Sequence, residues 1–217
     1  NGYIRPIAYK DDGVYRVWLH EATDKVSIFT FPVGAYIPVD QGAKVCVSAW
    51  RRVDDTAMPA RGKVNGTYVN SALVKSDAML SGFDDALVLN QDGHVAEGSA
   101  ANFMLVRDGV LITPPITSNI LEGITRRSLI ELASEVLGVQ VVEREIDRSE
   151  LYLCDEAFYC GTGAQVTPIS TIDHRPVGDG GVGNLTHLIR ELYARVLHGQ
   201  EPAYMHWLTP VPQLELA

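Results

Sequence analysis

The sequence predicts an α+β fold in which a small domain is followed by a larger one. Short β-type runs and tight-turn signals recur along the whole chain, with only a few amphipathic helical patterns between them. Several of the runs form hairpin pairs, which argues against a doubly wound parallel sheet. A polar, irregular stretch at residues 51–62 separates the two parts and indicates a linker.

The first part of the chain holds the β-type runs at residues 4–10, 25–31 and 44–50. Turns rich in Asp and Gly separate these runs, as expected of short strands. We therefore predict a small domain over residues 1–50, a linker over residues 51–62 and a large domain over residues 63–217.

Helices and hairpins alternate in the large domain. Apolar residues lie near one face of residues 68–80, and Gly82 ends that helix. Asp108-Gly109 is a two-residue turn signal between two β-type runs. We predict helices at residues 68–80, 125–137 and 185–197, and strands at residues 86–90, 94–97, 103–107, 110–113, 139–146, 156–160 and 169–173.

The composition excludes several classes of partner. Lys and Arg total 18 and Asp and Glu total 27, so the formal net charge is −9. An acidic chain without a basic run binds nucleic acid and anionic membranes poorly. No apolar stretch is long enough to cross a membrane, and no secretory signal opens the chain. The cysteines lack metal-ligand spacing, so we expect reduced thiols in a cytoplasmic protein and no metal site.

Two segments of the large domain suit the binding of anions. Residues 123–125 (Gly-Ile-Thr) open a predicted helix, where free N–H groups and the helix dipole favour negative charge. Residues 161–163 (Gly-Thr-Gly) follow a β-type run, and their small side chains leave the backbone N–H groups accessible. Each segment alone is more simply an ordinary helix start or turn. Together they suit a ligand that carries a phosphate and a carboxylate.

Three side chains are candidates for chemistry on such a ligand. Lys63 stands at the end of the predicted linker, and a lysine amine can form a Schiff base with a carbonyl cofactor. Tyr68 follows it closely and offers a hydroxyl. Glu97 could hold a pyridine nitrogen protonated, so that the ring accepts electrons. Each of these residues, taken singly, is more often a surface or turn residue.

A set of short motifs follows in a fixed order along the chain: Lys63-x-x-Gly66-x-Tyr68, Glu97-Gly98-Ser99-x-x-Asn102, Thr113-Pro114-Pro115, Gly123-Ile124-Thr125-Arg126, Asp155-Glu156-x-Phe158 and Gly161-Thr162-Gly163-Ala164. No single motif is specific, but their order and spacing together are. The ordered set resembles fold-type IV, or class IV, aminotransferases, which use pyridoxal phosphate (PLP), and the resemblance covers most of the chain.

The resemblance implies a role for each candidate in the large domain. Lys63 is implied as the Schiff-base lysine that also moves protons. Glu97 is implied to pair with the pyridine nitrogen and Tyr68 with the phenolic oxygen. The implied phosphate ligands are Ile124, Thr125 and Thr162.

Within this family the chain is most similar to branched-chain amino-acid aminotransferases. Residues 65–67 (Asn-Gly-Thr) after the lysine differ from the Asn-Leu type of sequence usual in sister branches. Residues 3–6 (Tyr-Ile-Arg-Pro) and 32–36 (Pro-Val-Gly-Ala-Tyr) look like substrate-contacting motifs of that branch. The implied substrate residues are Tyr3, Arg5, Tyr36, Thr162 and Gly163, with Arg5 on the second carboxylate of glutamate.

The resemblance also implies the reaction and the assembly. An amino group passes from leucine, isoleucine or valine to 2-oxoglutarate, in a protein that is at least a homodimer. The family uses a phosphate-binding arginine from a segment upstream of the Tyr3 motif. No such segment precedes Tyr3 here, so we expect part of the enzyme to lie before Asn1.

Three alternatives remain open from the sequence. The same scaffold carries D-amino-acid and (R)-amine aminotransferases and aminodeoxychorismate lyases. A non-catalytic α+β module that binds anions or a partner protein is a second possibility. The third is an inactive fragment of the true enzyme.

Overall fold

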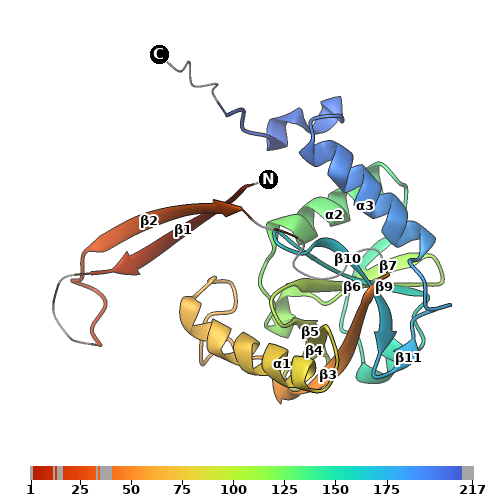
Figure 1. Ribbon diagram of the computed structural model, residues 1–217, viewed down its shortest axis with the longest axis horizontal. Coiled ribbons are helices and arrows are strands. Elements are labelled where there is room, and N and C mark those ends of the chain that lie inside the picture. Colours follow the sequence, from red (N-terminus) through yellow and green to blue (C-terminus); the bar gives the residue numbers. More distant parts are fainter. Residues whose placement is uncertain (1, 12, 14–16, 33, 35–40, 212–217) are drawn as a thin grey trace. The chain divides into compact units, whose positions relative to one another are not determined.

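The chain folds into two units in the computed structural model, which describes residues 2–11, 13, 17–32, 34 and 41–211. Residues 1–36 form the first unit and residues 37–217 the second. Each unit has its own internal contacts, and Figure 1 labels the strands and helices of both.

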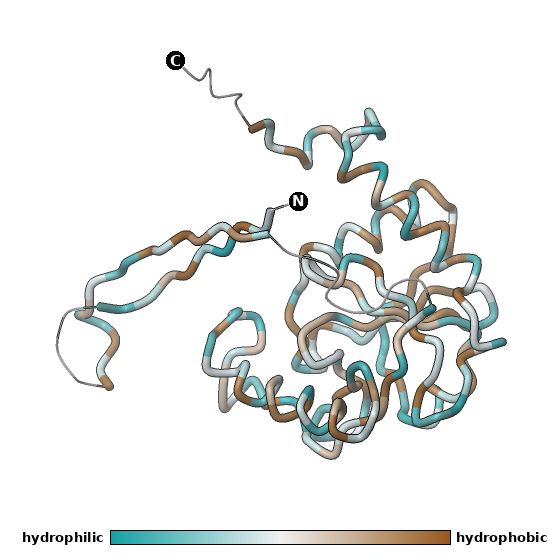
Figure 2. The backbone as a smooth tube through the Cα atoms, in the orientation of Figure 1, coloured by the Kyte–Doolittle hydropathy of each residue, from teal (hydrophilic) through white to brown (hydrophobic). Residues whose placement is uncertain are grey.

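The first unit is a hairpin of two antiparallel strands. Strand β1 (Gly2–Lys10) pairs along its whole length with β2 (Asp24–Pro32). Both strands carry hydrophobic residues (Figure 2), including Ile4 and Ile28, which are exposed. An ion pair of 2.7 Å between Lys10 and Asp24 closes one end of the ladder.

The second unit is built on one mixed sheet. Its strands run in the order β5-β4-β3-β10-β9-β6-β7-β8, with β11 paired to β10. Parallel pairs join β3 to β4 and to β10, whereas hairpins join β4 to β5 and β6 to β7. The strands are β3 (Ala43–Arg51), β4 (Asp85–Leu89), β5 (Val95–Gly98), β6 (Asn102–Arg107), β7 (Val110–Thr113), β8 (Val141–Glu143), β9 (Glu156–Gly161), β10 (Gln165–Ile172) and β11 (Arg175–Pro176).

Helices cover the sheet at two places. Helix α1 (Tyr68–Leu80) buries Val74 and Ala78 against Ala86 and Val88 of β4. Helices α2 (Ile124–Glu135) and α3 (Asn184–Leu197) lie side by side and pack with residues of β6, β9 and β10 into a second apolar cluster. Short 3-10 helices are η1 (Asn65–Thr67), η2 (Ile116–Ser118), η3 (Arg148–Tyr152) and η4 (Pro202–Trp207).

The largest apolar cluster fills the other face of the sheet. It joins residues of nearly every strand, among them Val45, Leu87, Phe103 and Tyr159, all at 0% exposure. Because neighbouring side chains on a strand point to opposite faces, the strands divide their residues between this cluster and the helix-covered clusters.

The α+β class and the main elements agree with the sequence prediction. Helix α1 covers the predicted residues 68–80, and all three predicted runs of the first fifty residues are strands. The predicted strand at residues 139–146 is shorter, because only Val141–Glu143 pair with β7, and β10 extends further than predicted.

The contacts divide the chain at a different place from the predicted boundary. The sequence analysis assigned residues 1–50 to the small domain, but β3 bonds to β4 and β10 and thus lies in the second unit. Residues 51–62, taken as a linker, also lie there. Parallel pairing between distant segments leaves no local signal in a sequence.

Two further findings concern the described part of the chain. None of its helices has the length and apolar character needed to span a membrane. Cys46, Cys154 and Cys160 are all free thiols.

Candidate active site

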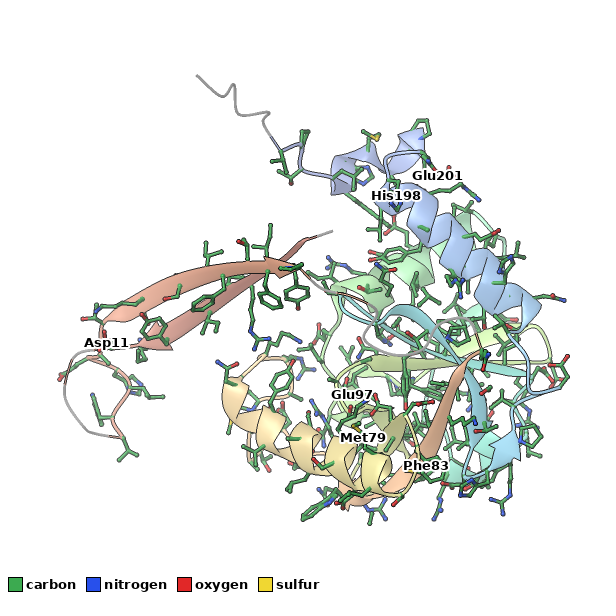
Figure 3. The ribbon with its side chains drawn as sticks, viewed as in Figure 1. Asp11, Met79, Phe83, Glu97, His198 and Glu201 are labelled. Atoms are coloured by element: carbon green, nitrogen blue, oxygen red, sulfur yellow. The ribbon has the colours of Figure 1, made fainter. Side chains whose placement is uncertain are left out.

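Glu97 is a buried carboxylate on the helix-covered face of the sheet. It pairs across the β4–β5 ladder with Val88, which belongs to the cluster under α1. A register shift between Val88 and Leu89 turns β5 so that Glu97 faces away from Val95, which lies in the opposite cluster. Figure 3 marks Glu97 inside the second unit.

Four groups act on the Glu97 carboxylate. Arg52 lies 2.7 Å from Oε1. The Asn102 amide and the Leu121 N–H donate to Oε2 over 2.9 and 3.2 Å. Burial raises the pKa of Glu97 to about 7, and Arg52, Leu121, Lys63 and Asn102 each oppose part of that rise. The result is an acid that changes its charge near neutral pH.

Lys63 lies on the loop that leads into α1. Its side chain is exposed, and Nζ stands 5.4 Å from the centre of the Tyr68 ring. Its positive charge also lowers the pKa of Glu97, against the larger effect of burial. Lys63 and Tyr68 therefore lie together at the N-terminal end of α1, and Glu97 is near enough for the charge of Lys63 to act on it.

The start of α2 leaves backbone donors available. Gly123 precedes the helix and provides no side-chain cap. The first N–H groups of a helix have no partner within the helix, and the dipole makes them attractive to anions. The Thr125 hydroxyl is buried and lies 3.4 Å from the hydroxyl of Tyr193 on α3.

The turn between β9 and β10 lies beside the same region. Asn102 of β6 pairs with Cys160, which directly precedes Gly161. Thr162 and Gly163 are exposed in the turn, and a Cβ at Gly163 would meet nothing within 4 Å. Asn102 thus connects this turn with Glu97 and, through Leu121, with the start of α2.

The predicted substrate residues of the first unit lie on its hairpin. Tyr3 and Arg5 are two positions apart on β1, so both side chains point to one face of the strand. The Tyr3 ring lies 5.5 Å from that of Phe31. Tyr36 lies outside the described residues.

The residues of the second unit fit the PLP that the resemblance implies. A buried carboxylate with only donors around it is suited to a cationic ring nitrogen, and a lysine and a tyrosine stand near it. Ser99, next to Gly98, has a buried hydroxyl without a hydrogen-bond partner among the described residues. Two sets of backbone donors, at the α2 start and the β9–β10 turn, complete the arrangement.

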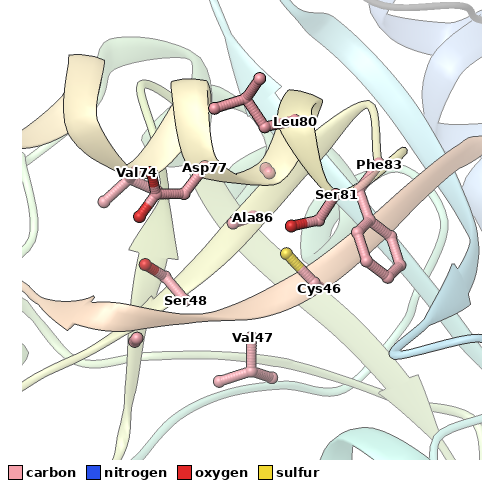
Figure 4. A pocket seen from close by; sticks show the side chains of 11 residues that line it. Cys46, Val47, Ser48, Val74, Asp77, Leu80, Ser81, Phe83 and Ala86 are labelled. Carbon is pink, nitrogen blue, oxygen red and sulfur yellow. The ribbon is translucent and has the colours of Figure 1, made fainter.

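A separate hollow of about 380 Å³ lies along the C-terminal half of α1 (Figure 4). Its lining includes Cys46, Ser48, Asp77 and Phe83 but none of the candidate site residues. Burial raises the pKa of the Cys46 thiol to about 11, so it stays protonated and is a weak nucleophile at neutral pH. Among the described residues, no cluster of side chains is suited to hold a metal ion.

Two residues of the site had no role in the sequence analysis. Arg52 falls in the segment interpreted as a linker, yet its N–H continues the β3–β4 ladder to Leu89 over 2.8 Å. Its position just after a strand was the only local signal. Asn102 was part of the motif set, but nothing in the sequence shows that its amide reaches Glu97.

Comparisons with known proteins agree with this geometry. The profile of a family described as amino-transferase class IV matches residues 1–172. A probable branched-chain-amino-acid aminotransferase of Aquifex aeolicus is 46% identical over 209 residues, which cover 96% of this chain and 67% of that protein.

Solved structures are also similar. A branched-chain aminotransferase of Thermoproteus uzoniensis, crystallised with norvaline, has 42% identity and a TM-score of 0.93, over 97% of this chain and 69% of that one. The PLP form of a branched-chain amino acid aminotransferase of Thermobaculum terrenum has 42% identity and a TM-score of 0.93, over 98% of this chain and 69% of that one.

Proposed function

Because the chain belongs to the class IV aminotransferase family, we propose that it is a PLP-dependent branched-chain amino-acid aminotransferase. It exchanges an amino group between leucine, isoleucine or valine and 2-oxoglutarate. The relatives named for this activity, and the structure of one of them with norvaline, support the substrate class. The observation that carries the proposal is the buried Glu97 carboxylate, which pairs with Arg52 at 2.7 Å and accepts hydrogen bonds from Asn102 and Leu121.

When bound, PLP supplies a carbonyl that an amine can attack and a ring that stabilises negative charge at the substrate Cα. The chain's own residues must therefore hold the ring, fix its charge and move one proton. Glu97 is the group for the ring charge. A carboxylate facing the ring nitrogen keeps a proton there, and Arg52 at 2.7 Å favours the ionised carboxylate.

Lys63 is the proposed covalent attachment point and proton carrier. Its amine is exposed on a loop, so it can reach a ligand and move between positions. With PLP bound, the Lys63 Nζ would take the proton from the substrate Cα. The Tyr68 hydroxyl, close to Lys63, is proposed to donate to the phenolic oxygen of the ring.

The two anion sites divide the remaining charges. The N–H groups of Ile124 and Thr125, with Thr162, are proposed for the phosphate, which fits an uncapped helix start. Thr162 and Gly163 offer N–H groups to the substrate α-carboxylate, together with Tyr3. Arg5 is proposed for the second carboxylate of glutamate and Tyr36 for the side-chain pocket.

The first test measures the cofactor linkage. The purified protein should give a visible absorbance band on addition of PLP, and borohydride should remove the band and leave the cofactor attached to the peptide that contains Lys63. Lys63→Ala should not show the band, and its turnover of leucine should fall by at least about a thousandfold, as expected when a nucleophile is removed. Lys44→Ala, an exposed lysine on β3, is the matched control and should keep both. Full activity in Lys63→Ala would exclude this assignment.

The second test measures substrate discrimination. Arg5→Ala should weaken the binding of glutamate and of 2-oxoglutarate by roughly tenfold or more, because a charge-assisted contact is lost. The binding of leucine should weaken much less. A panel that includes D-amino acids, (R)-amines and aminodeoxychorismate separates the sister activities. Equal loss for glutamate and leucine would contradict the role of Arg5.

We also propose a cytoplasmic homo-oligomer. The acidic charge and free thiols suit a cytoplasmic enzyme. Size-exclusion chromatography with light scattering measures the mass of the assembly. A monomer at micromolar concentration would contradict the proposal.

A further inference from the structure

Asn102 makes two short hydrogen bonds with one amide group. Its Nδ2 donates to Glu97 Oε2 over 2.9 Å and to the Leu121 carbonyl over 2.8 Å. Both partners are acceptors, so the NH₂ side of the amide must face them. The residue is 5% exposed, and bonds of this kind are costly to lose when they are buried.

Leu121 closes the arrangement from the other side. Its own N–H donates to the same Glu97 oxygen over 3.2 Å, and its carbonyl also accepts the Gly123 N–H over 2.8 Å. Glu97, Asn102 and Leu121 therefore form a triangle of hydrogen bonds. Leu121, the member of the triangle nearest to α2 in the sequence, lies three residues before the first residue of that helix, Ile124.

Gly123 leaves room for the Asn102 amide. A Cβ at this position would lie 2.1 Å from Asn102 Oδ1, although its backbone, with φ −66°, accepts any residue. Only a glycine therefore fits here without moving the amide. The contact gives a second way to disturb Asn102 without changing it.

We propose that Asn102 is a positioning residue that fixes the Glu97 carboxylate relative to the loop that opens α2. The acid meant for the ring nitrogen and the N–H groups meant for the phosphate then keep one spacing. This inference rests on the proposed function, since it assigns the spacing to a phosphorylated pyridine. The contacts themselves are testable without that cofactor.

The bond from Asn102 has a measurable effect on Glu97. An amide N–H that donates to a carboxylate favours its ionised form. Loss of this bond should therefore raise the pH at which Glu97 ionises. A hydrogen bond to a charged group contributes about 1.5 kcal/mol or more, which corresponds to roughly one pH unit.

The experiment follows Glu97 by infrared spectroscopy in the protein without PLP. The carbonyl band of the protonated acid is identified by its absence in Glu97→Gln, and its midpoint pH is measured. Asn102→Leu, which keeps the number and branching of the side-chain heavy atoms, should move the midpoint up by about one pH unit. Gly123→Ala should move it in the same direction through the Asn102 contact. Asn70→Leu removes an amide bond to the Arg51 carbonyl and serves as the matched control, with an unchanged midpoint.

The second measurement is calorimetric titration of the same variants with inorganic phosphate. Asn102→Leu and Gly123→Ala should both lower the affinity for phosphate several-fold, because the start of α2 is no longer held in one position. An unchanged midpoint in both folded variants would overturn the proposal, and so would unchanged phosphate affinity. If one variant does not fold, the other decides. Absence of PLP binding by the wild type would refute the proposed function alone, since neither measurement uses PLP.

Discussion

Arg52 and Glu97 form an ion pair of 2.7 Å whose side chains are only 10% and 5% exposed. Arg52 also donates from Nε to the Asn119 carbonyl over 3.1 Å, which anchors the loop before α2. A buried charge needs a partner, because the interior solvates it poorly. The pair therefore lets an acid exist at this depth and ties it to the same loop that Asn102 holds.

Removal of Arg52 should destabilise the protein in a pH-dependent way. Arg52→Met leaves Glu97 buried with less compensation, and breaking such a pair costs roughly 3–5 kcal/mol when the remaining group is charged. At pH 5 Glu97 is protonated and the loss should be smaller than at pH 8. Urea unfolding at both pH values measures the difference. Equal losses at the two pH values would show that Glu97 does not carry the effect.

The stability of the protein without cofactor should fall as the pH rises from about 4.5 to about 7. Burial raises the pKa of Glu97 from 4.5 to about 7, so between these values the folded state holds a proton that the unfolded chain has released. The folded state binds more protons there, and raising the pH lowers the free energy of unfolding. The contribution is roughly 3 kcal/mol at 1.36 kcal/mol per unit of pKa.

Glu97→Gln isolates this contribution. The variant cannot titrate at this position, so its unfolding free energy should lack that part of the decline. Subtraction of the two urea-derived pH profiles gives the Glu97 contribution directly. A flat difference between pH 4.5 and 7 would mean that the folded state does not hold the proton.

The sequence could predict individual strands and helices but not which of them pair with one another. Alternation and turn residues predicted β1, β2 and α1 well, because these signals are local. The parallel pairing of β3 with β4 and β10 is not local, and it places residues 43–50 in the second unit instead of the predicted small domain. The same pairing carries Arg52 from an apparent linker to Glu97, so this partner could not be predicted.

The candidate residues themselves could be predicted from the sequence. Lys63, Tyr68 and Glu97 came from the order of motifs, and their neighbourhood depends on the register shift in β5 and on the loop before α1. A register shift is not visible in a pattern of residues. The assignment of each residue to a role stays a prediction for the experiments above.

Substitution by alanine should have different effects at Gly98 and at Gly163. A Cβ at Gly98 would lie 2.6 Å from the ring of Tyr159, which is fully buried. Overpacking of this kind costs about 1–3 kcal/mol, so Gly98→Ala should lower the melting temperature and displace the neighbouring Glu97. Gly163→Ala meets no atom within 4 Å and should leave the melting temperature unchanged while it raises KM for the amino acid. Thermal unfolding and steady-state kinetics of both variants check the two predictions. A lower melting temperature in Gly163→Ala with none in Gly98→Ala would contradict them.

The hydroxyl of Tyr193 should support phosphate binding through Thr125. The two oxygens lie 3.4 Å apart, and Thr125 is the second residue of α2, where a phosphate is expected. Tyr193→Phe keeps the ring in its apolar cluster and removes only this contact, so stability should change little. Loss of one neutral hydrogen bond, about 1 kcal/mol, predicts a roughly fivefold lower affinity for inorganic phosphate. Thr125→Val should lower this affinity further, and adding Tyr193→Phe to that variant should have no additional effect. Calorimetric titration of the two single variants and the double variant measures this coupling, and fully additive losses would show that Tyr193 acts independently of Thr125.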